Sequence, residues 1–74
     1  MKLKLRLHTP DEIKRFVDIT SRYREDLSLI RDRYVVDAKS ILGIFSMDLN
    51  KPLMLVAESE NEYLRNDLRE FVVA

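Results

Sequence analysis

Residues 3 to 7 alternate strictly between leucine and a basic residue. A period of two is typical of a strand that turns one face to a core and the other to water. We therefore expect a strand at about Lys2–His8. The basic side chains belong to its exposed face, and any fold of this chain has to cover the leucine face.

The pattern changes at Thr9, where a helix start follows the strand directly. Thr9 is suited to the N-cap, Pro10 to the first helical position, and Glu12 completes a capping box. Apolar residues then recur at helical spacing, which predicts a helix at about Pro10–Arg24.

Three further strands are expected. Asp26–Arg31 and Arg33–Asp37 alternate around a short turn and form a hairpin, although arginine resists the positive φ that the tightest turns require. Pro52–Glu58 is almost entirely apolar between its ends, which is typical of a central strand. Period-two strands joined by a hairpin predict an antiparallel sheet.

Two helices complete the expected set, at about Ser40–Met47 and Glu60–Phe71. A second capping box at Ser59–Glu62 is expected to open the last one. The order β-α-β-β-α-β-α predicts an α+β fold, with four antiparallel strands and three helices on one face, as a single domain over residues 1–74. The expected core residues are Ile13, Phe16, Val17, Leu27 or Leu29, Leu55, Leu64, Leu68, and Phe71 or Val72.

The composition excludes several classes of function. Thirteen basic and thirteen acidic residues cancel, which argues against nucleic acid or an anionic membrane as partner, because both select basic patches. Without cysteine and with one histidine, the chain lacks a thiolate or multi-histidine metal site. No apolar run approaches the roughly 20 residues that cross a bilayer. We expect a cytoplasmic protein without metal or cofactor.

The stretch Ala38–Ser46 resembles the Lys-Ser-Ile-Met-Gly segment of the histidine-containing phosphocarrier (HPr) family of the bacterial sugar phosphotransferase system. The resemblance is specific from about Val36 to Leu49, and the order of elements extends it over nearly the whole chain. It implies the same α+β fold. In this family the serine starts a short helix and, in Gram-positive bacteria, is the target of a regulatory kinase. The resemblance thus makes Ser40 a candidate phosphosite.

The family's active site, Gly-Ile-His-Ala-Arg-Pro, is replaced here. Counting back without gaps from Ser40, the phosphoryl-accepting histidine falls on Thr9 and its arginine on Asp11. An anion at the arginine position would repel a phosphate. His8, one residue upstream, is the one candidate substitute, and its alternative role is simply to end the first strand.

The short helix also has more apolar residues than one contact face can bury. The resemblance implies a docking surface for partner proteins there, formed by Lys39, Ile41, Leu42 and Phe45. The alternative is that Ile41 and Phe45 complete a small core. Ser40 is expected to cap this helix by accepting a hydrogen bond from the N–H of Leu42 or Gly43, and Leu42 is expected to stay exposed.

Three functions follow, of which we favour the first. It is an HPr-like protein of the phosphotransferase system, or derived from it, that is not an enzyme and acts by binding proteins such as system components or a serine kinase. The second is an active phosphocarrier that uses His8. The third is an interaction module of the same fold unrelated to sugar transport.

Overall fold

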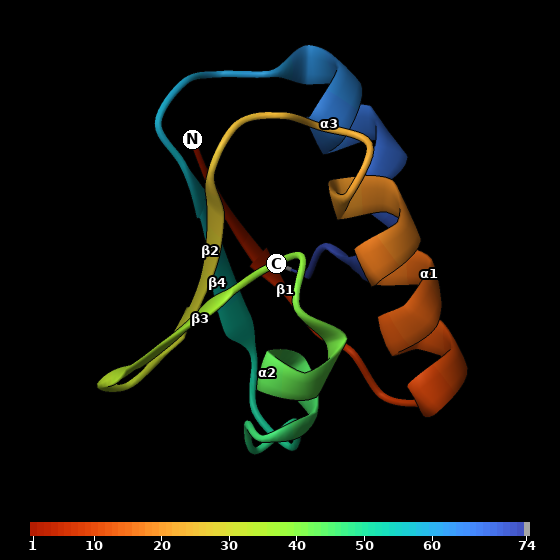
Figure 1. The fold of residues 1–74 in the computed structure, drawn as a ribbon, viewed down its shortest axis with the longest axis vertical. Helices are drawn as coiled ribbons and strands as arrows, with labels where there is room; N and C mark the ends of the chain where they lie inside the picture. Colours follow the sequence, from red (N-terminus) through yellow and green to blue (C-terminus); the bar gives the residue numbers. More distant parts are fainter. Residues whose placement is uncertain (74) are drawn as a thin grey trace.

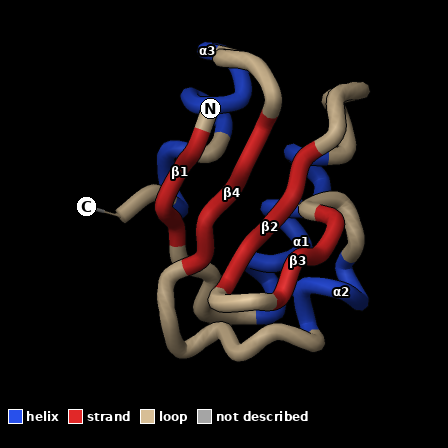
Figure 2. The backbone as a smooth tube through the Cα atoms, turned by 90° about the vertical axis from the view of Figure 1, so that its left-hand side faces the viewer, coloured by secondary structure: helices blue, strands red, loops and turns tan. Residues whose placement is uncertain are grey.

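A computed structural model describes residues 1–73 as two layers, a sheet and a set of helices on one of its faces (Figures 1 and 2). The sheet has the order β1-β4-β2-β3, and all neighbouring strands are antiparallel. The strands are β1 (Lys2–Leu5), β2 (Leu27–Arg31), β3 (Tyr34–Asp37) and β4 (Leu53–Ala57). The helices are α1 (Pro10–Thr20), α2 (Ile41–Phe45), α3 (Glu62–Asp67) and the 3-10 turn η1 (Arg69–Phe71). The predicted open-faced α+β sandwich is confirmed.

The core lies between the sheet and the helices, and its centre is Leu55 of β4. Leu55 pairs with Leu3 of β1 on one side and with Leu29 of β2 on the other, so these three side chains share the covered face. All three are buried. The central position predicted for β4 is therefore confirmed. The expected core residues Ile13, Phe16, Leu27, Leu29, Leu55, Leu64 and Leu68 are all buried.

The first strand and the first helix are both shorter than predicted. The ladder of β1 ends at Leu5, although Leu7 remains buried. Helix α1 ends at Thr20, not at Arg24, and Val17 is half-buried where we predicted a buried residue. Thr20 is fully buried instead, and its hydroxyl donates to the Ala38 carbonyl at 2.9 Å. This contact holds the end of the helix against the segment that follows β3.

The last helix also begins later than predicted. Its N-cap is Asn61, whose side-chain oxygen accepts from the Leu64 N–H at 3.1 Å, so the predicted capping box at Ser59 is wrong. The amide nitrogen of Asn61 donates to Glu25 at 2.7 Å, a contact that Ser59 does not make. Phe71 is buried and packs edge-on against Phe16, whereas Val72 is exposed. No helix within residues 1–73 has the length and apolarity needed to span a membrane.

Candidate functional site

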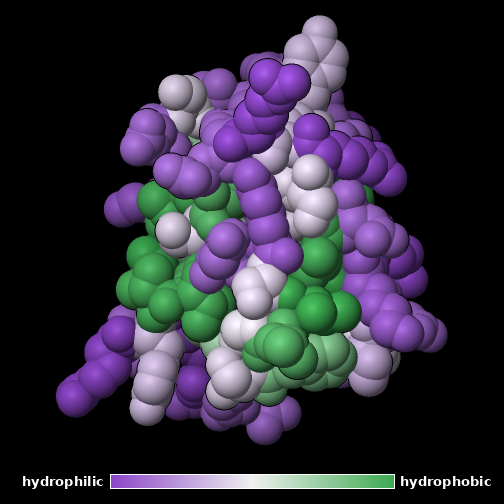
Figure 3. All heavy atoms as spheres, viewed as in Figure 1, coloured by the Kyte–Doolittle hydropathy of each residue, from purple (hydrophilic) through white to green (hydrophobic). Residues whose placement is uncertain are grey.

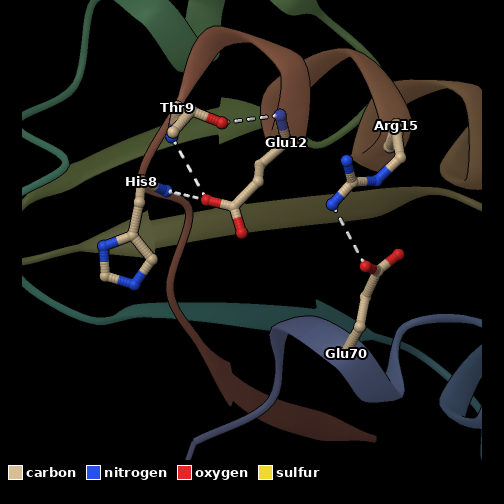
Figure 4. Close-up of polar contacts among 5 residues, drawn as sticks. All are labelled: His8, Thr9, Glu12, Arg15 and Glu70. Carbon is tan, nitrogen blue, oxygen red and sulfur yellow. Dashed lines mark hydrogen bonds and ion pairs between the residues drawn. The ribbon is translucent and has the colours of Figure 1, made fainter.

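The N-terminus of α1 is the first candidate site. Thr9 is its N-cap, and its Oγ1 accepts a hydrogen bond from the Glu12 N–H at 3.1 Å. In return, Glu12 Oε1 accepts from the His8 N–H at 2.7 Å and from the Thr9 N–H at 3.2 Å (Figure 4). The predicted capping box is confirmed, and the Glu12 carboxylate occupies two backbone N–H groups in front of the helix.

The charge at this helix start is negative. Asp11 and Glu12 both lie in the first turn, where the helix dipole favours carboxylates. Arg15, one turn further on, points away from these carboxylates, and its guanidinium donates to Glu70 at 3.1 Å (Figure 4). The same guanidinium lies over the Phe71 ring. No ion pair within residues 1–73 reaches Asp11 or Glu12. Two carboxylates without a paired cation are unfavourable for a bound phosphoryl group.

His8 is exposed, and its imidazole points away from Thr9 and Glu12 (Figure 4). Only its backbone N–H faces the helix start. The structure thus places His8 beside α1 but does not bring its ring nitrogens to the helix N-terminus.

The start of α2 is the second candidate site. Ser40 is the N-cap, and its Oγ accepts from the Gly43 N–H at 3.1 Å, which confirms one of the two bonds predicted for it. Gly43 is the chain's single glycine. A Cβ built on it would lie 3.2 Å from Ser40 Oγ and 3.3 Å from the Val36 Cβ. A side chain at this position would therefore crowd Ser40 and Val36 where α2 approaches β3.

The side chains of α2 divide between core and solvent. Ile44 is buried and Ile41 half-buried, whereas Leu42 is 79% exposed and Phe45 is 46% exposed. The predicted exposure of Leu42 is confirmed, and Phe45 does not complete the core. Hydrophobic surface gathers over α2 at the lower centre of Figure 3. We call Leu42 and Phe45, together with the half-buried Ile41, the α2 surface.

Two long-range contacts of Tyr23 were not anticipated from sequence. The half-buried Lys39 turns its ammonium to the Tyr23 carbonyl at 2.5 Å, across 16 residues of chain. The Tyr23 hydroxyl donates to Asp67 at 2.6 Å, across 44 residues. Burial and this bond to Asp67 raise the pKa of Tyr23 to about 12. No local pattern predicts such contacts, because each depends on how the layers pack.

Solved structures with the same architecture place the chain in a family. The Crh protein of Bacillus subtilis, described as a catabolite repression protein, is 30% identical, with a TM-score of 0.63. The match covers 97% of this chain and 90% of Crh. The chain belongs to the HPr-like family. A scan of protein-family models finds no match, and a search of curated proteins finds none either.

Two further HPr structures resemble this HPr-like chain. An HPr dimer from Thermoanaerobacter tengcongensis is 28% identical, with a TM-score of 0.66, and the match covers 86% of this chain and 76% of that one. The phosphocarrier protein HPr of Bacillus anthracis is 22% identical, with a TM-score of 0.70, over 99% of this chain and 96% of the other. The latter similarity concerns the fold alone. This HPr-like chain combines that fold with a carboxylate-filled start of α1 and an exposed apolar surface on α2.

Proposed function

We propose that this HPr-like protein belongs to the sugar phosphotransferase system, or derives from it, and acts in the cytoplasm by binding other proteins. In this proposal it has lost the usual phosphoryl-accepting histidine, whose place falls on Thr9, and the arginine beside it, whose place falls on Asp11. Ser40 is a regulatory phosphosite, and the α2 surface docks the partner. The main observation in support of the lost phosphoryl-accepting site is that Glu12 accepts hydrogen bonds from the His8 and Thr9 N–H groups.

Those hydrogen bonds oppose phosphoryl transfer in two ways. A helix N-terminus binds an anion through its free N–H groups and the positive end of its dipole. Here a carboxylate of the same chain already accepts from the two N–H groups that precede the helix. A phosphoryl group arriving at this point would also meet the negative charge of Asp11. Thr9 offers a hydroxyl whose oxygen accepts the capping bond, and within residues 1–73 this hydroxyl donates no hydrogen bond to a base that could activate it.

Phosphoryl transfer is tested directly with labelled phosphoenolpyruvate and the system's general enzyme. We expect no acid-labile phosphate on this chain, while an HPr protein with its histidine serves as the positive control. Formation of a histidine phosphate that His8→Ala abolishes would establish the second candidate, an active phosphocarrier working through His8.

The α2 surface supports a binding role. Exposed apolar side chains grouped on one element commonly mark partner sites. Leu42 is the outermost of them and does not contribute to the core, so its truncation removes contact area without opening a cavity. A phosphate on Ser40 adds about −1.5 to −2 charge beside this surface. In this proposal, phosphorylation weakens docking to an acidic partner. It does not unfold α2, because the Ser40 oxygen that caps the helix is retained.

Binding is tested by calorimetric titration with purified phosphotransferase-system proteins and with an HPr serine kinase. We expect Leu42→Ala to weaken binding at least about tenfold, as is usual for a central interface residue. Tyr63→Ala on α3 is the matched control, because Tyr63 is 80% exposed and lies on a different helix. Equal losses from the two variants would contradict a docking role for α2.

Regulation at Ser40 is a separate test. Incubation with the kinase and ATP is expected to add one phosphate to the unaltered chain and none to Ser40→Ala, with Ser46→Ala, at the opposite end of α2, as the control. If no component of the system binds and no phosphate is added, the third candidate stands: an interaction module of this fold unrelated to sugar transport.

A further inference from the structure

The two edges of the sheet differ in how they are covered. The outer side of β1 is occupied by the C-terminal segment: the Arg6 N–H donates to the Phe71 carbonyl, and the Val73 N–H donates to the Lys4 carbonyl, both at 2.9 Å. β3 is the last strand in the row on the other side (Figure 2), and it crosses in front of the other strands in Figure 1. Within residues 1–73 no strand pairs with the outer side of β3.

The register of β2 with β3 identifies the backbone groups on this open edge. The Ala38 N–H donates to the Leu27 carbonyl at 2.9 Å, so these opposite residues form a hydrogen-bonded pair. Bonded and non-bonded pairs alternate along an antiparallel ladder. Val35, which lies opposite Ile30, therefore belongs to a non-bonded pair. Its N–H and C=O both point away from β2, toward solvent.

The residues around Val35 are self-complementary under two-fold symmetry. Two positions before Val35 lies Arg33, and two positions after it lies Asp37. We propose that β3 pairs antiparallel with β3 of a second copy of this chain, centred on Val35, so that two sheets join into one. Each Val35 would then exchange both of its free backbone hydrogen bonds with the other Val35.

Charge complementarity selects this partner and this register. With Val35 opposite itself, Arg33 of each copy lies opposite Asp37 of the other, which forms two symmetry-related cross-strand ion pairs. Neither side chain has an ion pair within residues 1–73 of its own chain. Charged residues usually protect an edge strand from pairing. Here Arg33 and Asp37 have opposite charges and lie at equal distances from Val35, so they attract a second copy in place of repelling it.

Apolar contacts favour the same arrangement on both faces of the sheet. Val35 is 62% exposed and already lies in a row with Ile30 and Met54 on the uncovered face. Pairing would continue this row across the two-fold axis. On the opposite face, Tyr34, which is 63% exposed, would lie against Val36 of the second copy. Aromatic and β-branched residues make favourable cross-strand pairs.

Sedimentation of the whole chain at increasing concentration, up to about 1 mM because small contacts of this kind are weak, tests the proposal. We expect a reversible monomer–dimer equilibrium. Arg33→Asp and Asp37→Arg should each be monomeric, because like charges then face one another. An equimolar mixture of the two variants should restore a dimer, since every cross-strand pair in the mixed species is again of opposite sign. Lys2→Asp, an equal charge reversal on β1, should leave the equilibrium unchanged.

Amide hydrogen exchange of the unaltered chain gives a second measurement that needs no variant. The Val35 N–H should exchange about tenfold more slowly at high concentration than at low concentration. The Val36 N–H, which is bonded within the monomer, should not change. A chain that stays monomeric would overturn the proposal. So would a dimer that survives both charge reversals, or a Val35 amide that exchanges at the same rate at every concentration.

Discussion

Replacing Ser40 by alanine separates the structural role of this residue from its proposed regulatory role. In the structure the hydroxyl oxygen accepts from the partly buried Gly43 N–H at 3.1 Å. Alanine keeps the Cβ of Ser40 and removes only the hydroxyl acceptor. We expect a loss of about 1 kcal/mol in the free energy of unfolding, the usual cost of losing a serine cap.

The loss converts into a measurable shift of the melting temperature. Unfolding entropy of about 2.1 cal/mol/K per residue gives about 0.16 kcal/mol/K for 74 residues. A destabilisation of about 1 kcal/mol therefore lowers Tm by about 6 °C. Thermal unfolding followed by far-UV circular dichroism measures this shift, and urea titration gives the free energy at constant temperature.

Two control variants test whether the loss of stability comes from the missing cap. Ser40→Asp should stay within about 0.5 kcal/mol of the original chain, because a carboxylate also accepts at the N-cap and suits the helix dipole. Ser21→Ala changes an exposed serine and should also stay within about 0.5 kcal/mol. The reasoning is refuted if Ser40→Ala matches Ser21→Ala, or if Ser40→Asp is destabilised as much as Ser40→Ala.

Three other changes probe the layers around the candidate sites. Leu55→Ala should lower the free energy of unfolding by about 2–5 kcal/mol in urea titrations, because this side chain is fully buried at the centre of the sheet. Gly43→Ala should destabilise by about 1 kcal/mol in the same assay, since crowding against Val36 and the cap outweighs the better helix propensity. The raised pKa of Tyr23, about 12, favours its neutral form when folded. Its contribution to stability is therefore present below pH 10 and lost as the pH rises through about 12, and Asp67→Asn should lower this pKa in a phenolate absorbance titration.

The parts of the fold that sequence predicted well depend on interactions between near neighbours. Thr9, Pro10 and Glu12 meet within a single turn, so their capping box could be inferred from spacing alone. Ser40 and Gly43 are three residues apart, and their bond could be inferred in the same way. The alternation of the first strand likewise set which of its residues face the core.

The errors occurred where a distant residue decides a boundary. Helix α1 was expected to run to Arg24, but Thr20 is held by the Ala38 carbonyl, 18 residues away. The sequence pattern predicts a cap at Ser59, but Asn61 caps the helix and also binds Glu25 across 36 residues. A local pattern cannot rank two acceptable caps when a long-range contact favours one of them.

Sequence by itself determined the α+β class, the central position of β4, and the capping of α1 and α2. Tertiary structure alone decided that Leu42 lies outside the core. It also decided that, among residues 1–73, no cation pairs with Glu12 and no strand covers the outer side of β3. The physical reason is the distance along the sequence between the residues that interact. Caps and alternation are set by bonds within a few residues, whereas exposure and edge coverage depend on segments such as residues 71–73 returning to the first strand.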